Sequence, residues 1–124
     1  MTRRKLQYLR IKKDDLDFAM HYLPDCGVVA DGSELYITFD NTVLSMSFYK
    51  DKDTNDGNTL MRTEIRTREG DDSSPVAFAP VAFGNLYDCV VKDDDMKKAI
   101  RTAIEMGKAF DIAYGYKKML LKGA

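Results

Sequence analysis

Arginine side chains recur along one short stretch of the chain, and they are the groups best suited to binding chemistry. Between residues 61 and 68 apolar or hydroxyl side chains alternate with charged ones, which are Arg62, Glu64, Arg66 and Arg68. On a strand, Arg66 and Arg68 would lie about 7 Å apart on one face, close to the separation of successive phosphates along a nucleic-acid strand. Because arginine binds phosphate bidentately, the stretch predicts a site for a nucleotide, an oligonucleotide or a single-stranded nucleic acid.

Aromatic and basic residues elsewhere in the chain could complete such a site by stacking on a base or holding a phosphate. The expected ligand-binding set is Arg62, Arg66, Arg68, Tyr36, Tyr49, Phe83, Lys97 and Arg101. Glu64 interrupts the arginine row, however. The same pattern therefore also fits a solvated strand face with cross-strand ion pairs, and both interpretations stay open.

The sequence offers no catalytic constellation. It has no glycine-rich phosphate loop, no nucleophile-elbow sequence and no cysteine–histidine zinc pattern. Cys89 with His21, or Asp88 with Asp93, can be imagined as pairs, but no spacing brings either pair together. We therefore expect a non-enzymatic binding protein without catalytic residues, cofactor or metal, and an uncharacterised small enzyme is the third hypothesis.

One loop resembles the start of a calcium-binding EF-hand. Residues 51–57 alternate oxygen-bearing side chains and end in Gly57, but this glycine comes one residue late. Arg62 occupies the twelfth position, where a bidentate glutamate would close the site. A turn at Asp56 and Gly57 explains the loop better.

Charge is segregated along the chain, although the formal net charge is only -1. Residues 1–13 carry six basic side chains and no acidic one, and residues 14–34 carry six acidic and no basic ones. Such segregation fits ion pairing across the fold. It also fits electrostatic recognition of a protein target, so the second hypothesis is a small viral or mobile-element accessory protein that binds and inhibits a host protein.

Length and composition predict one domain spanning residues 1–124. The chain is 44% hydrophobic and 31% charged, a balance typical of a globular protein. No apolar stretch is long enough to cross a membrane, and no signal peptide is evident. We expect a cytoplasmic protein whose two cysteines, Cys26 and Cys89, are reduced.

Hydrophobic periodicity predicts an α+β fold. A short first strand precedes a helix that Asp14 or Asp15 would cap, whose buried face would be Leu16, Ala19, Met20 and Leu23, and which Pro24 would end. Period-two alternation then predicts a hairpin turning at residues 40–41, a strand over 61–67, an edge strand or covering loop over 75–84, and a strand over 86–91. The expected architecture is an antiparallel sheet of about five strands packed by a short N-terminal and a long C-terminal helix.

The C-terminal helix is expected to begin near Met96 and to run for up to about 25 residues, with Gly115 as a kink or early end. Ala99, Ala103 and Gly107 repeat at intervals of four, and small side chains in such a row permit close packing. Apolar side chains also spread around much of the helix. We expect a homo-oligomer, most simply a dimer, with Ala99, Ala103, Gly107 and Phe110 in its interface.

Overall fold

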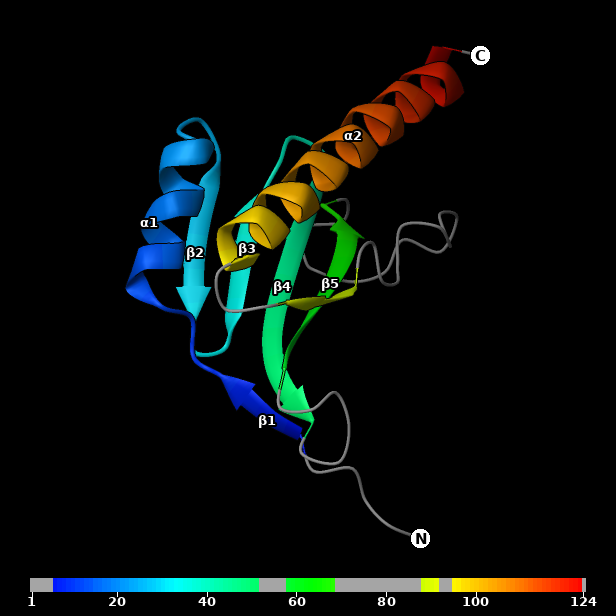
Figure 1. Cartoon of the computed structure of the whole chain (residues 1–124). Coiled ribbons are helices and arrows are strands. Elements are labelled where there is room, and N and C mark those ends of the chain that lie inside the picture. The colour runs from blue at the N-terminus through cyan, green and yellow to red at the C-terminus, as the bar shows by residue number, and fades with distance from the viewer. Residues whose placement is uncertain (1–5, 52–57, 69–87, 92–94, 124) are drawn as a thin grey trace, which may run out of the picture.

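The computed structural model of the chain describes residues 6–51, 58–68, 88–91 and 95–123. It contains six strands and two helices (Figure 1). In chain order these are β1 (Leu6–Leu9), α1 (Lys13–Tyr22), β2 (Gly27–Asp31), β3 (Glu34–Thr38), β4 (Thr42–Asp51), β5 (Thr59–Thr67), β6 (Cys89–Val91) and α2 (Met96–Gly123).

The strands form one antiparallel sheet in the order β2-β3-β4-β5-β6. The ten-residue strand β4 is long enough to pair with β3 through its first half and with β1 through its second half, where Leu9 lies opposite Phe48. The predicted α+β architecture is confirmed, with six strands instead of about five. The additional strand is β2, which pairs with β3 across a turn at Gly32, where φ is +61°.

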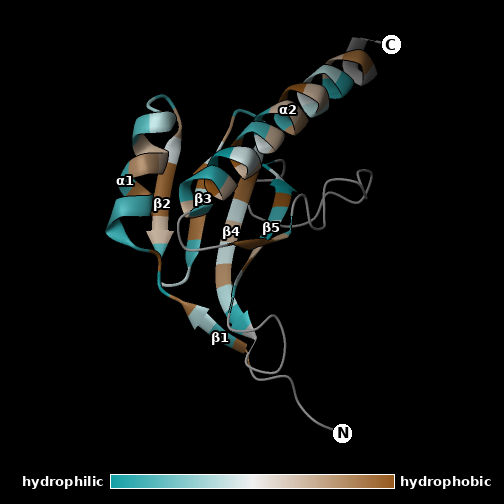
Figure 2. Ribbon diagram, viewed as in Figure 1, coloured by the Kyte–Doolittle hydropathy of each residue, from teal (hydrophilic) through white to brown (hydrophobic). Residues whose placement is uncertain are grey.

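Both helices cover the same face of the sheet and enclose one core. Along β5 every second residue is buried, and the same alternation runs along β3 and β4. Figure 2 shows apolar and polar residues interspersed along these strands. The fully buried side chains include Leu35, Ile37, Leu44, Met46, Met61, Ile100 and Ile104. The hairpin and the strand over 61–67 are therefore confirmed, because one-sided burial leaves a clear period-two pattern.

The start of α1 differs from the expectation. Lys12 is the N-cap and makes no side-chain capping bond, whereas Asp14 and Asp15 lie in the first turn of the helix. Both carboxylates face Lys97 of α2 instead of the free N–H groups. Met20, which was predicted on the buried face, is 48% exposed. Ala19 and Leu23, predicted on the same face, are buried and pack in the core.

The small-residue row of α2 packs against the chain's own sheet. A Cβ added to Gly107 would lie 2.9 Å from Leu44 Cδ2 and 3.2 Å from Phe39 Cε2. Ala99 and Ala103 are buried as well. This row, predicted as an oligomer interface, is thus already covered within one chain, and contact between copies would need other residues of α2.

Helix α2 continues through Gly115 to Gly123, so Gly115 does not end it. A Cβ at Gly115 would lie 2.5 Å from Asn41 Nδ2, which shows that this glycine allows the β3–β4 turn to approach the helix. The far end of α2 projects past the sheet (Figure 1). Of the helices in the described segments, none is sufficiently long and apolar to span a bilayer.

Candidate functional site

The arginine strand lies on the face of the sheet opposite the helices. The alternation of β5 places Arg62, Glu64 and Arg66 on this open face, across from Ser47, Ser45 and Val43 of β4. Arg66 Nη2 lies 3.6 Å from Glu64 Oε2, and both side chains are close to half exposed. The interruption that the sequence shows at Glu64 is thus an ion pair within the row.

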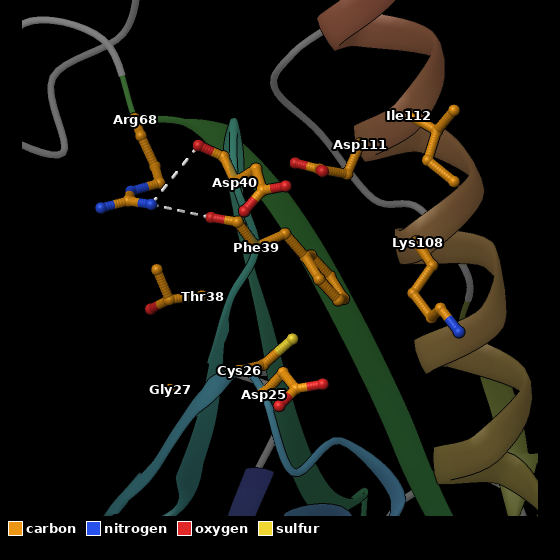
Figure 3. A pocket seen from close by; sticks show the side chains of 10 residues that line it. All are labelled: Asp25, Cys26, Gly27, Thr38, Phe39, Asp40, Arg68, Lys108, Asp111 and Ile112. Atoms are coloured by element: carbon orange, nitrogen blue, oxygen red, sulfur yellow. Dashed lines mark hydrogen bonds between the residues drawn. The ribbon is translucent and has the colours of Figure 1, made fainter.

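Arg68 has a different environment from the other two arginines. Its Nη1 donates to the carbonyl oxygens of Phe39 at 2.9 Å and Asp40 at 3.4 Å (Figure 3). Its main-chain N–H donates to Asn41 O at 3.0 Å. The guanidinium therefore ties the end of β5 to the β3–β4 turn. It does not continue a row of phosphate ligands with Arg66.

The predicted aromatic residues of the open face also have partners within the chain. The Tyr36 hydroxyl donates to Glu34 Oε2 at 2.6 Å, and this hydrogen bond raises the pKa of Tyr36 to about 12. The ring of Tyr49 lies 5.7 Å from that of Tyr8. Both tyrosine rings are only partly buried, so these contacts leave them accessible to a ligand on the open face.

A polar groove of about 280 Å³ runs over this face. Its lining residues are Tyr8, Ser33, Glu34, Ser45, Ser47, Arg62 and Glu64. Two carboxylates thus accompany one guanidinium, so the groove has no excess of positive charge to attract a phosphate.

The remaining predicted ligand residues do not join this face. Lys97 and Arg101 lie on α2, in the helix layer on the other side of the sheet. Lys97 is hydrogen-bonded to Asp14 and lies 3.9 Å from Asp15. Phe83 lies outside the described residues. The structure therefore divides the predicted set among several places instead of gathering it into one site.

A second pocket, not expected from the sequence, lies on the helix side of the sheet, where β1 pairs with the second half of β4. It has a volume of about 360 Å³, and we call it the basic pocket. It is lined by Leu9, Arg10, Ile11, Lys12, Asp15, Phe48, Lys50, Thr59 and Met96. Apolar side chains from β1, β4 and α2 thus combine with three basic side chains.

Local structure explains how the three cations converge. Arg10 and Lys12 belong to the short connection between β1 and α1. Lys50 continues the inward-facing series of Leu44, Met46 and Phe48 along β4, and the pairing of β1 with β4 places it near that connection. The three cations thus come from segments about forty residues apart in the chain.

Basic side chains outnumber acidic ones in the lining of the basic pocket. Arg10, Lys12 and Lys50 form no ion pair with an acidic side chain within the described ranges, whereas Arg66, Lys97 and Lys108 each do. Asp15 is the one carboxylate among the lining residues, and burial raises its pKa against the opposing effects of Lys97 and Lys12. Three cations against one carboxylate leave the lining with a formal charge of +2.

A third pocket of about 330 Å³ lies between the β3–β4 turn, the segment before β2, and α2 (Figure 3). Asp111, which lines it, is buried and accepts hydrogen bonds from Asn41 N at 2.9 Å and Thr42 Oγ1 at 2.7 Å. Burial and the nearby carboxylates raise the pKa of the Cys26 thiol, which disfavours a reactive thiolate. Asp111 here joins the helix to the sheet.

The imagined catalytic pairs are not assembled in the described part of the chain. His21 lies on α1, which packs beside β2, while Cys89 lies on β6 at the opposite edge of the sheet. Asp93 and residues 52–57 of the calcium-like loop lie outside the described residues. No group of three possible metal-ligating side chains occurs among the residues that the structure describes.

No protein-family model, curated protein or solved structure matches the chain. The geometry and charge of these pockets are therefore the basis for inferring function.

Proposed function

We propose that the protein is a non-enzymatic binding protein whose basic pocket takes a phosphate-bearing ligand with a ring, such as a nucleotide or one unit of a nucleic-acid strand. The observation that carries this proposal is that Arg10, Lys12 and Lys50 line one pocket with apolar side chains and a single carboxylate, Asp15, whose charge Lys12 and Lys97 share. A phosphate would supply the missing negative charge.

The size and composition of the pocket suit such a ligand. Small-molecule pockets have volumes of roughly 300 to 1,000 Å³ and combine apolar walls with a few polar groups, so 360 Å³ suffices for one ring and its phosphate. The ring would lie against Ile11, Phe48 and Met96. Arg10 can grip a phosphate bidentately, and the two lysines act as point charges beside it.

Removing single cations tests the proposal. Lys12→Ala and Lys50→Ala should each weaken binding of fluorescently labelled ATP roughly tenfold to a hundredfold, because a hydrogen bond to a charged group contributes about 1.5–3 kcal/mol. Fluorescence anisotropy measures the affinity, and its loss with added salt reports the phosphate contacts. Labelled single-stranded DNA, measured in parallel, distinguishes a free nucleotide from a strand as the preferred ligand.

The open face provides the matched control. Arg62→Ala with Arg66→Ala removes two cations from the other side of the sheet and should leave ATP affinity within a factor of two. If this double variant loses binding while Lys12→Ala and Lys50→Ala keep it, the ligand binds the arginine strand and not the basic pocket. Melting temperatures of all variants check that the fold is retained.

A protein partner on the open face is the second candidate function. Tyr8 is 58% exposed there and lies with Arg62 along the polar groove. Tyrosine and arginine are enriched in protein interfaces, and the carboxylates of Glu34 and Glu64 beside Arg62 favour a polar protein surface over a polyanion. A protein that co-purifies with the native chain but not with a Tyr8→Ala, Arg62→Ala variant would support this function, and co-purification unaffected by the variant would contradict it.

A further inference from the structure

The C-terminal half of α2 carries an apolar surface on the side that faces away from the sheet. Ile112 is 70% exposed, Tyr116 60%, Met119 62% and Leu120 56%. With the exposed Ala109 and Ala113 they form one face of the helix, which we call the α2 stripe. Gly107, Asp111 and Tyr114 lie on the opposite side and are buried, so the helix has an exposed apolar side in addition to its buried one.

Nothing in the described part of the chain covers the α2 stripe. The last buried residue of the helix is Tyr114 in the residues whose burial is described, and beyond this point α2 projects past the sheet (Figure 1). A helix with a second apolar side usually packs against another element. The question is which element supplies the contact.

The exposed area of the stripe is sufficient for a contact between two copies. A large aromatic side chain presents about 150–250 Å² when fully exposed. With the exposed fractions above, the four large side chains present on the order of 500 Å². If the contact covered all of this area, two copies would bury about 1,000 Å² in total, which reaches the lower limit for a specific interface.

We propose that two copies of this chain associate through the α2 stripe as an antiparallel helix pair, with the two-fold axis near Tyr116. About this axis, Ile112 of one copy meets Leu120 of the other, and Ala113 meets Met119. A large side chain thus faces a small one in the second contact. A two-fold interface requires this kind of self-complementarity, in which each contact occurs twice.

Charge favours the antiparallel direction over the parallel one. Lys98 and Arg101 lie on the same side of α2 as the stripe, about three and two turns before it, and both are exposed. A parallel pair would place them opposite the same residues of the other copy, where like charges repel. The antiparallel pair moves the two basic halves to opposite ends of the dimer.

Sedimentation velocity tests the association at micromolar concentrations. The native protein should have a mass of about 28 kDa, twice the 14.1 kDa of one chain. Ile112→Glu and Leu120→Lys should each give monomers. Their combination in one chain should restore the dimer, because each glutamate then faces a lysine of the other copy. Val29→Glu, at a 59% exposed position on β2, is the control and should stay dimeric.

Cysteine cross-linking tests the register. In a background with Cys26→Ser and Cys89→Ser, Tyr116→Cys should form a disulfide between copies on oxidation, and Lys98→Cys should not. Efficient cross-linking at position 98 would overturn the antiparallel arrangement. A native monomer throughout the micromolar range would overturn the dimer and leave the stripe to another segment of the chain or a different partner. A dimer that survives Ile112→Glu would also overturn the proposal.

Discussion

Gly107→Ala probes the contact that fixes α2 on the sheet. Alanine is favoured over glycine inside a helix by about 1 kcal/mol, so a solvent-facing Gly107 would make this substitution stabilising. The added Cβ would instead lie 2.9 Å from Leu44 Cδ2 and 3.2 Å from Phe39 Cε2. Leu44 is fully buried and Phe39 nearly so, and overpacking of this kind costs roughly 1–3 kcal/mol. We expect a net loss of about 1 kcal/mol in the free energy of unfolding.

A double-mutant cycle separates the steric effect from helix propensity. Leu44→Ala alone should destabilise by about 2–5 kcal/mol, but in the presence of Gly107→Ala the loss should be smaller by at least about 1 kcal/mol, because the new methyl group occupies part of the cavity. Urea unfolding provides all four free energies. Arg101→Ala compared with Arg101→Gly, at an exposed position of the same helix, measures propensity alone. A Gly107→Ala variant about 1 kcal/mol more stable than native would refute the close packing of this row.

Three further predictions concern hydrogen bonds and charge. Asp111→Ala should lower the free energy of unfolding by about 3 kcal/mol, because buried donors of the β3–β4 turn lose a charged acceptor, and a loss below 1 kcal/mol in urea unfolding would contradict this. Lys97→Ala should destabilise at neutral pH and progressively less in acid, since Lys97 opposes the burial effect that raises the pKa of Asp15; a thermal-stability difference that stays constant with pH would argue against it. Absorbance titration should give Tyr36 a pKa of about 12, and stability linked to this hydroxyl should fall as pH rises from its ordinary pKa of 10.0 to that value. Glu34→Gln should return the pKa of Tyr36 toward 10.0. If the pKa of Tyr36 were the same in this variant as in the native protein, the hydrogen bond to Glu34 would not be the cause of the raised value.

The sheet is largely predictable from the sequence because one of its faces is buried. Alternation along 34–39, 44–48 and 61–67 follows directly from that burial, and α2 shows the helical period over a long segment. Strand β2 was not anticipated. At the edge of the sheet its residues are only partly buried or exposed, so Gly27–Asp31 shows little contrast between its two faces.

The basic pocket was harder to predict than the fold. Lys50 reaches Arg10 and Lys12 only through the pairing of β1 with β4, and register between segments so far apart is not encoded locally. Two signals were nevertheless present: a basic N-terminal segment with no acidic residue, and a lysine that continues the buried series of β4. The arginine row was correctly placed on a strand, and its interruption by Glu64 is visible in the sequence. That Glu64 pairs with Arg66 of the same strand, and that Arg68 binds the carbonyls of the β3–β4 turn, becomes apparent only in three dimensions.

The central claim is that the basic pocket binds a phosphate-bearing ligand, and a direct comparison of two double variants tests it. Affinity for labelled ATP and for labelled single-stranded DNA is measured by fluorescence anisotropy for the native chain, for Lys12→Ala with Lys50→Ala, and for Arg62→Ala with Arg66→Ala. Loss of binding in the first double variant, with near-native affinity in the second, is the predicted result. Native affinity in the first variant, or no measurable binding of either probe by the native chain, would contradict the account.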